Sequence, residues 1–267
     1  MHVHFLDPYR PKISPVHSLD PRVKLVLILA FILCTALTPS AAWPIYILLL
    51  SLAVAVEVLS ELGVGYVFKR AVLALPFVLA ALPVIFSTAG SPLFSLPLWS
   101  WTLTASLPGL ERFLSITIKS WISVQAAILL AATTSFPDLL VAMRAVRIPR
   151  LLVAVFGLMW RYLFVLVDEA LRLLRARAAR SGSSGDPKLK TGGSLVWRAR
   201  VAGGMAGSLF LRGFERSDRI YMAMLSRGYD GEVRSLPLPE LTPAHWLVLF
   251  FGLSLLTLLL LFSHLLW

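Results

Sequence analysis

The stretch LLVAVFGLMWRYLFVLV, from Leu151 to Val167, is apolar enough to cross a bilayer, but Arg161 lies near its centre. A charge at the middle of a membrane helix costs about 2.5–3.5 kcal/mol on the insertion scale. Whether this stretch crosses the membrane decides on which side everything after it lies. The residues before and after it supply the answer.

The composition shows that lipid is the solvent of this chain. Of its 267 residues, 58% are hydrophobic and 15% are charged, with a mean hydropathy of +0.80. A soluble domain carries about a quarter charged residues, so a soluble enzyme and a disordered protein are excluded. Cys34 is the one cysteine, which also excludes a disulfide scaffold. The expected fold class is an all-α integral membrane protein.

Five segments are apolar and long enough to be membrane spans, which need roughly 20 residues. The first is expected to extend back to Asp20 and Pro21, a good N-cap and first-turn pair. Pro76 and Pro83 should kink the third. The five predicted spans are Leu25–Thr38, Trp43–Leu59, Ala71–Thr88, Phe113–Thr133 and Ala244–Leu266.

The distribution of charge predicts the topology. Of the 25 Lys and Arg residues, 17 lie between residues 135 and 234 with 8 Asp and Glu, a net charge of +9, against +2 for the rest of the chain. The basic N-terminal arm and the loop Ser60–Arg70 are expected in the cytoplasm, and the uncharged connection Pro39–Ala42 outside. If Leu151–Val167 crossed, the most basic stretch would lie outside. We therefore expect it not to cross.

Three regions follow from this topology: residues 1–134 form the arm and four spans, 135–234 a cytoplasmic insert, and 235–267 the return to the last span. The insert is expected to hold three helical pieces, at Asp138–Val146, Pro149–Arg180 and Ser194–Ser226, with the linker SGSSGDPKLKTGG before the last. The outer loop SPLFSLPLWSWTLTASLPG (residues 91–109) could form a small hairpin.

The last piece of the insert reads as an amphipathic helix with a basic stripe. One face carries Arg212, Arg216, Arg219 and Arg227, and the other carries Phe210, Phe214, Tyr221 and Leu225. Such a helix either lies on the membrane with its arginines at lipid phosphates or meets a protein partner, and the pattern alone weighs these equally. Nucleic acid is not expected as a partner, because no aromatic residues are interleaved among the arginines.

Smaller features of the insert suggest contacts. Gly203, Gly204 and Gly207 would allow another helix to pack closely, although plain flexibility is the alternative. Asp168 precedes Arg172 by four residues, a favourable helical ion pair. Mid-helix arginines such as Arg216 are expected to meet solvent or lipid headgroups. Arg180, just before the glycine-rich linker, lies at a helix tip from which a guanidinium could bind a partner bidentately.

The sequence offers no catalytic, metal or cofactor site. It contains neither the GxxxxGK[ST] phosphate loop nor HExxH, and no acidic residues at metal-ligand spacing. The chain is therefore expected to bind no cofactor itself and not to be an enzyme.

Three motifs resemble the transmembrane T component of energy-coupling factor (ECF) ABC-type transporters, in particular the cobalt subfamily of CbiQ proteins. They are Leu19-Asp20-Pro21-Arg22-Val23-Lys24, the tip Ala179-Arg180-Ser181, and GGMAGSLFLRGFERSDRIYMAMLSRGYDGE over Gly203–Glu232. The resemblance covers nearly the whole chain, and the last block is its specific part.

The resemblance implies a scaffold in a multi-pass plasma-membrane complex. Such proteins bridge two cytoplasmic ABC ATPases, which bind the ATP, and a substrate-binding membrane S component that is CbiM-like here, with a possible small auxiliary subunit and surrounding lipid. Their coupling helices end in Ala-Arg-Gly-like tips that insert into the ATPases. Those tips correspond to Ala179-Arg180-Ser181 and Ser226-Arg227-Gly228, each with one serine departure that leaves the arginine in place.

The resemblance implies cobalt uptake, a supply step for cobalamin biosynthesis, while nickel or a vitamin remain alternative substrates. A less favoured hypothesis is an integral-membrane enzyme acting on lipids or prenyl groups, which would need clustered acids or a nucleophile and base. A self-contained carrier is the third, and would need paired ionisable groups or broken helices near the midplane.

Overall fold

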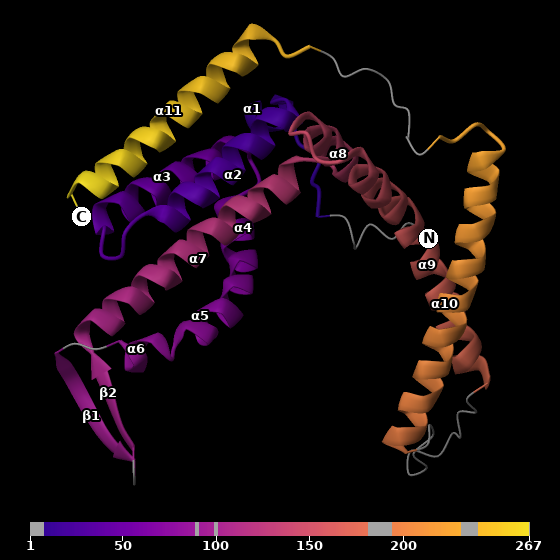
Figure 1. Cartoon of the computed structure of the whole chain (residues 1–267), viewed down its shortest axis with the longest axis horizontal. Helices are drawn as coiled ribbons and strands as arrows, with labels where there is room; N and C mark the ends of the chain where they lie inside the picture. Colours follow the sequence, from indigo (N-terminus) through magenta and orange to yellow (C-terminus); the bar gives the residue numbers. More distant parts are fainter. Residues whose placement is uncertain (1–7, 89–90, 99–100, 181–193, 231–239, 267) are drawn as a thin grey trace. The chain divides into compact units, whose positions relative to one another are not determined.

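The computed structural model describes residues 8–88, 91–98, 101–180, 194–230 and 240–266. Within them the chain is helical apart from one hairpin, so the predicted all-α membrane fold is confirmed (Figure 1). The elements are α1 (Pro15–Ser18), α2 (Pro21–Leu37), α3 (Trp43–Leu59), α4 (Val64–Ala71), the 3-10 helix η2 (Val72–Ala74), α5 (Leu75–Ala81), α6 (Val84–Ser87), β1 (Pro92–Leu98), β2 (Trp101–Ser106), α7 (Leu107–Thr133), α8 (Phe136–Ala145), α9 (Arg150–Arg180), α10 (Leu195–Leu225) and α11 (Pro243–Leu266).

Helix starts follow the local sequence closely. The Asp20 carboxylate accepts a 2.8 Å hydrogen bond from the main-chain N–H of Arg22 and caps α2, as predicted. Ser106 and Ser135 cap α7 and α8 in the same way, each accepting from an N–H three residues later. The expected second span, Trp43–Leu59, coincides with α3.

The third predicted span is wrong at its start. It was expected to begin at Ala71, after an inner loop that held Lys69 and Arg70, but both basic residues lie inside α4, and helical structure runs from Val64 to Ser87. Long basic side chains can remain in a helix at the membrane surface because their charged ends reach water. The predicted irregularity is confirmed, since the path is divided into α4, η2, α5 and α6 and breaks at Pro83.

The outer loop forms the predicted hairpin. Strands β1 and β2 pair antiparallel, with Leu98 opposite Trp101 and Ser95 opposite Thr104. The register shifts between Pro92 and Phe94, which marks a bulge. The hairpin leads directly into α7.

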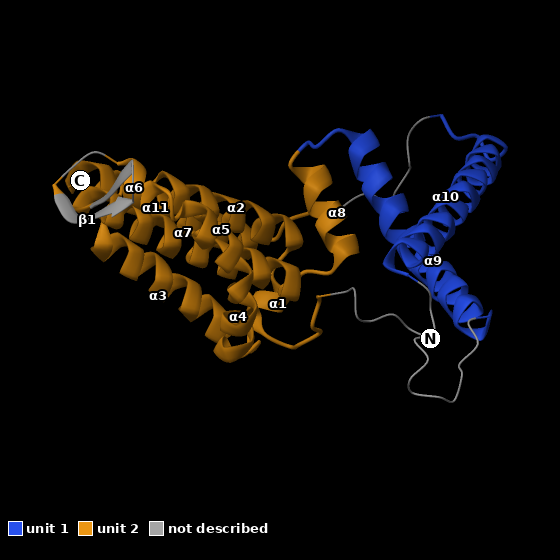
Figure 2. Cartoon of the chain, turned by 90° about the horizontal axis from the view of Figure 1, so that it is seen from below, with its two compact units in different colours: residues 1–3, 147–237 blue, residues 4–146, 238–267 orange. Residues whose placement is uncertain are grey.

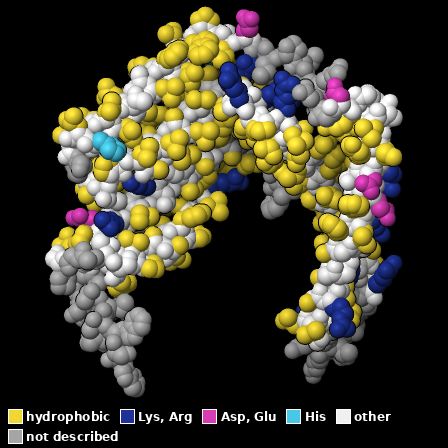
Figure 3. All heavy atoms as spheres, in the orientation of Figure 1, with side chains coloured by type: hydrophobic (Ala, Val, Ile, Leu, Met, Phe, Trp, Pro, Cys, Tyr) yellow, Lys and Arg dark blue, Asp and Glu magenta, His cyan; other side chains and the backbone are white. Residues whose placement is uncertain are grey.

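The helical bundle has its core where α2, α3, α7 and α11 meet. Buried side chains from all four helices form one cluster, including Phe31, Ile45, Ile122 and Leu256. Helix α11 approaches α2 closely at Gly252, where a Cβ atom would lie 2.6 Å from Leu27 Cδ2. Hydrophobic side chains are spread over much of the visible face of the bundle, as expected for a lipid-facing surface (Figure 3).

Contacts divide the chain into two compact units (Figure 2). The bundle unit comprises His4–Val146 and Leu238–Trp267, and the second unit comprises Arg147–Pro237 with the first three residues. Helix α8, expected as the first piece of the insert, packs on α2 and belongs to the bundle unit. The boundaries expected at residues 135 and 234 stay predictions.

Among the described residues, four helical stretches are long and apolar enough to cross a membrane. Helix α3 is apolar but shorter, and α2 has 17 residues in the same bundle. The qualifying stretches are Val64–Ser87, Leu107–Thr133, Arg150–Arg180 and Pro243–Leu266. The third contains Leu151–Val167; length and composition admit it as a span, so its cytoplasmic location stays a prediction that depends on charge.

Candidate coupling site

The second unit consists of two long helices that cross. Helices α9 and α10 have 31 residues each, about 46 Å at 1.5 Å per residue. In Figure 1 their C-terminal ends lie at opposite ends of the crossed pair, that of α9 at the bottom and that of α10 at the top. The two ends that carry the predicted arginine tips therefore project away from each other.

A carboxylate of α9 holds the crossing. Glu169 Oε1 accepts a 2.9 Å hydrogen bond from Arg212 Nη1, and Glu169 Oε2 accepts one of 3.3 Å from Arg216 Nη2. The Glu169 side chain is 19% exposed, whereas that of Arg212 is 58% exposed. Beside this pair, a Cβ atom added at Gly213 would lie 3.7 Å from Leu166 Cδ2, so α10 passes close to the Leu166 side chain of α9 there.

The sequence did not reveal this contact. The expectation that Arg216 meets solvent or lipid headgroups is wrong, because it pairs with Glu169. The expected pair of Asp168 and Arg172 is not formed in the described helix; the neighbouring carboxylate faces α10 instead. An i,i+4 pair can be read from one helix, whereas a pair between two helices depends on their crossing, which the sequence does not encode in any fixed spacing.

Helix α10 ends in a Schellman motif that fixes Arg227. The N–H of Tyr229 donates to the carbonyl of Met224, and the N–H of Gly228 donates to that of Leu225, each at 3.0 Å. Gly228 has φ of +78°, the left-handed conformation that costs other L-residues about 1–2 kcal/mol. Glycine in the predicted tip Ser226-Arg227-Gly228 is thus the residue that stops the helix and leaves Arg227 exposed at its end.

Helix α9 ends at the other predicted tip. Ala179 and Arg180 are its last two residues and both are exposed, while Ser181 lies outside the described residues. Arg177 and Arg180 occupy the last turn, where positive charge is favoured by the helix dipole.

Both tips lie well away from the crossing. Arg180 lies 11 residues after Glu169, and Arg227 lies 11 residues after Arg216 and 15 after Arg212, the two arginines that Glu169 binds. Along its helix, Arg180 is therefore about 16 Å from the ion pair that joins the helices, and Arg227 is about 16–22 Å from it. A tilt of either helix about the crossing would move its tip.

Much of the surface of this unit is uncovered. Gly203, Gly204 and Gly207 are exposed, and a Cβ atom at any of them would meet nothing within 4 Å. Their predicted role in helix packing thus has no counterpart among the described residues of this chain. The apolar face expected on α10 is also exposed, with Phe210 at 72% and the others similarly open: Phe214, Tyr221 and Leu225.

In the part of the chain that the structure describes, no group of three or more His, Cys, Asp or Glu side chains could hold a metal ion. The site that remains is a pair of exposed arginine tips on crossed helices beside open apolar surface. This arrangement can bind partners and transmit movement.

Comparison with known proteins identifies the family. The family model described as "CbiQ: Cobalt transport protein" matches residues 12–237. The chain belongs to the CbiQ family. CbiQ proteins are membrane components of transporters, so this chain is a multi-pass plasma-membrane protein without catalytic activity of its own.

Curated relatives agree along almost the whole CbiQ chain. The energy-coupling factor transporter transmembrane protein EcfT of Brevibacillus brevis is 28% identical, with 88% of each chain covered. EcfT of Lactococcus lactis is 26% identical, over 84% of this chain and 83% of its own. A protein of Methanocaldococcus jannaschii whose name gives no function is 25% identical, over 97% of this chain and 87% of its own.

Proposed function

We propose that this CbiQ protein is the energy-coupling T component of an ECF importer that takes up cobalt ions. It would join two cytoplasmic ABC ATPases, which bind the ATP, to a separate substrate-binding membrane subunit. The names of its relatives support an ECF complex, and the family description supports cobalt.

The observation that carries this proposal is the pair of arginine tips at opposite ends of the crossed helices. A planar guanidinium at a helix end can bind a partner's carboxylates or carbonyls in a bidentate manner. Two such tips, each about 16–22 Å from the crossing, suit two separate partner subunits rather than one. The two ATPases of an ABC-type complex meet that requirement.

The exposed apolar faces of α9 and α10 support a second kind of partner. Large apolar side chains are exposed along both helices, including Leu151, Val155 and Met159 on α9 and Phe214 and Met222 on α10. Contiguous apolar surface of this kind marks a protein or membrane contact. The substrate-binding subunit is a membrane protein, so it could cover such a face at the bilayer boundary.

The proposed mechanism is mechanical. Closure of the ATPases would move the tips, and the crossing held by Glu169 would convert that movement into a tilt of α9 relative to α10. The apolar faces would carry the tilt to the substrate-binding subunit and reorient it. This chain would need no metal ligands, because the cobalt ion would bind in the other subunit.

The test replaces both arginine tips. A charged hydrogen-bonding group in a desolvated interface costs about 2–5 kcal/mol when truncated, or about 30-fold to several thousand-fold in affinity. Arg180→Ala and Arg227→Ala should each weaken ATPase association and uptake, with the double variant weakest. Lysine at either tip should restore only part of the ATPase association and uptake, because it keeps the positive charge but cannot make the bidentate hydrogen bonds of a guanidinium.

Arg219→Ala is the matched control, since Arg219 is on α10, exposed, and in no ion pair within the described residues. ATPase retention is measured by pull-down at equal membrane expression, together with uptake of labelled cobalt. Parental retention and uptake in the double variant would refute the coupling role. Uptake of nickel or a vitamin instead of cobalt would refute cobalt as the substrate but would not contradict the coupling role.

A further inference from the structure

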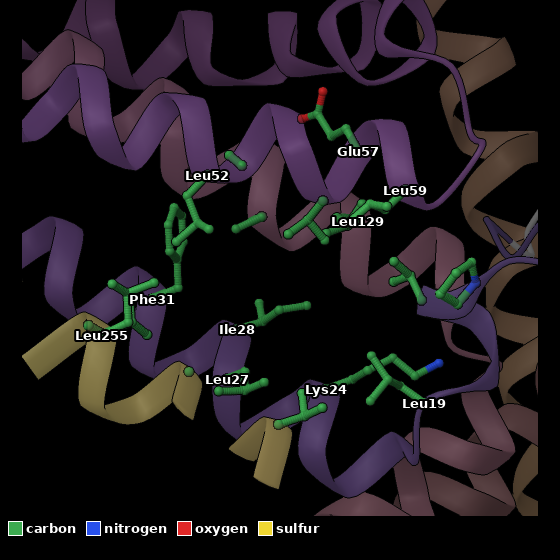
Figure 4. Close-up of a pocket in the computed structure, with 18 of the residues that line it drawn as sticks. Leu19, Lys24, Leu27, Ile28, Phe31, Leu52, Glu57, Leu59, Leu129 and Leu255 are labelled. Atoms are coloured by element: carbon green, nitrogen blue, oxygen red, sulfur yellow. The ribbon is translucent and has the colours of Figure 1, made fainter. Parts of the chain in front are cut away.

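A long groove lies between helices of the bundle unit. It is bounded by α1, α2, α3, α7 and α11, has a volume of about 440 Å³, and is lined almost entirely by apolar side chains. This volume falls in the roughly 300–1,000 Å³ range of small-molecule sites. In Figure 4, Leu19 and Lys24 lie at one end of the groove, and Phe31 and Leu255 lie at the other.

Under the predicted topology, the groove runs from the inner surface toward the bilayer centre and extends over about two thirds of the depth of one leaflet. With the N-terminus in the cytoplasm, Lys24 marks the inner end of α2 and Phe31 lies deeper in the membrane. These two residues are seven apart, about 10 Å along the helix, compared with about 15 Å for half of the hydrocarbon core. An acyl chain entering from the inner surface would follow this path.

The cytoplasmic end of the groove is flanked by the N-terminal arm. Pro15 and Val16 of α1 line the groove itself. The N–H of Arg10 donates to the carbonyl of Ala132 at 3.0 Å, three residues beyond the lining residue Leu129. Lys12 Nζ donates to the carbonyl of Glu61, two residues beyond Leu59, which also lines it. These contacts keep the arm's basic side chains beside the groove entrance.

Positive charge gathers near this end of the groove, because Tyr66, which packs in one cluster with the lining residue Leu129, carries two guanidinium groups on its ring. The Arg10 guanidinium lies 3.8 Å from the centre of the Tyr66 ring, and that of Arg70 lies 4.7 Å from the same centre. Among the described residues neither guanidinium is paired with a carboxylate. Two cations that share one ring favour an anion beside them.

The arm also carries a feature typical of a lipid interface. Ile13, directly after Lys12, is 99% exposed. An apolar side chain next to a basic residue lies at low cost where headgroups meet acyl chains. In water alone, the apolar surface of the Ile13 side chain would stay exposed.

We propose that this groove and its basic entrance bind one anionic phospholipid of the inner leaflet. One acyl chain occupies the groove, and the phosphate lies near Arg10, Lys12 and Arg70. The site rests on the membrane location of the bundle and not on the coupling function, because none of its residues belongs to α9 or α10.

The test measures lipid retention on the purified chain by native mass spectrometry, without ATPases. Phosphatidylglycerol and phosphatidylcholine with identical chains are offered at equal concentration. Each basic residue near a membrane surface contributes about 1 kcal/mol toward an anionic lipid. The variant Arg10→Ala/Lys12→Ala/Arg70→Ala should therefore bind phosphatidylglycerol about 100-fold more weakly. The control Arg175→Ala/Arg177→Ala/Arg219→Ala loses the same charge from the second unit and should retain the parental preference.

A second arm tests the groove. Val248→Trp places a large side chain on the α11 wall and should abolish retention of both lipids. Because that variant could misfold, competition on the parental chain provides a separate measurement: lysophosphatidylglycerol should displace the bound lipid, and glycerol phosphate should not. Equal retention of both lipids by the parental chain, parental binding by the entrance variant, or displacement by glycerol phosphate would each overturn the proposal.

Discussion

At the scale of single residues, some buried polar side chains of the bundle are hydrogen-bonded and others are not. Lys24 is buried, but its Nζ donates to the carbonyl of Thr133 at 3.1 Å and to that of His17 at 3.3 Å. Gln125 is 0% exposed, and neither its Oε1 nor its Nε2 has a hydrogen-bond partner in the described part of the chain. An unsatisfied buried polar group costs about 1–3 kcal/mol.

We predict that Gln125→Leu does not lower the stability of the purified protein and raises it by up to about 2 kcal/mol. The control is Ser115→Ala, because the buried Ser115 Oγ accepts a 3.1 Å hydrogen bond from the N–H of Ala41. That variant leaves an N–H unpaired and should lose stability. Thermal unfolding in detergent measures both. A Gln125→Leu protein that is as destabilised as Ser115→Ala would mean that Gln125 has a hydrogen-bond partner in the membrane.

His17 makes the docking of the N-terminal arm sensitive to pH. Its Nε2 donates to the carbonyl of Arg10 at 3.1 Å, and its Nδ1 lies 2.7 Å from Ser14 Oγ. Burial lowers the pKa of His17 below its usual 6.5, opposed by the hydrogen bond to Arg10 and reinforced by Lys24 and Lys12. Since the folded-state pKa is depressed, the docked arm is favoured above pH 6.5 and loses this contribution as pH falls through the lower folded value.

Hydrogen exchange at the Arg10 amide, which donates to Ala132, reports this docking. Its protection factor should decrease from pH 7.5 to pH 5.5 in the parental protein and stay level in His17→Gln. His264→Gln, at an exposed position near the C-terminal end of α11, is the control and should behave as the parent. A parental protection factor that does not change with pH would contradict the prediction.

At the scale of elements, the ends of helices carry the functional geometry. The Schellman motif at Gly228 both terminates α10 and holds Arg227 at its exposed end. Nothing lies within 4 Å of a Cβ atom there, so any cost of substitution comes from backbone conformation alone.

We predict that Gly228→Ala costs about 1–2 kcal/mol of local stability at the end of α10. Gly228→Asn should cost less, because asparagine tolerates the left-handed conformation. Gly207→Ala is the matched control, since it has open space and needs no positive φ. Exchange of the Tyr229 amide measures fraying, and ATPase pull-down measures the proposed coupling role of Arg227. If Gly228→Ala and Gly207→Ala fray α10 equally, the helix does not end as described.

The elements were predictable to the extent that they depend on local sequence. The cap at Asp20, the span Trp43–Leu59 and the hairpin could be read directly, because each is decided by neighbouring residues. The start of α4 could not be predicted, because the basic residues Lys69 and Arg70 are typical of a loop. They fit in a helix only where their charged ends can reach water at the membrane surface. The Glu169 contacts depend on how two helices cross, and no spacing within one helix reveals that.

The arginine tips were found by resemblance and by their position before glycine. The structure adds the reason for Gly228 and shows that both tips lie at helix ends well away from the crossing. The docked N-terminal arm was missed, because its hydrogen bonds go to main-chain carbonyls of distant helices. Such acceptors carry no sequence signature.

At the scale of the whole molecule, the two units differ in how well they fit a position inside the membrane. The bundle unit needs lipid around it, whereas α9 is apolar enough for a membrane but ends in a densely basic segment. Placing that segment and the linker after it outside would oppose the positive-inside preference.

We predict that the linker is cytoplasmic and the C-terminal end extracellular. A background with Cys34→Ala is used, since Cys34 is the one native thiol. In intact cells, cysteine at Ser184 should resist a membrane-impermeant thiol reagent, and cysteine at Trp267 should react. Permeabilised cells, in which both should react, provide the control. Labelling of Ser184→Cys from outside would make Leu151–Val167 a true span.

The contact of Gly252 with Leu27 joins the last helix of the chain to the first long one, and this sets an order for biosynthesis. Roughly 200 residues separate α2 from α11, which takes about 10–40 s at typical rates of synthesis. Throughout that interval α2 is in the membrane without α11, and α9 and α10 are completed before it ends. On the proposed function, the crossed helices would therefore be available to ATPases before α11 completes the bundle. Because Val248 and Phe251 of α11 supply one wall of the groove, a lipid would be enclosed only at the final step.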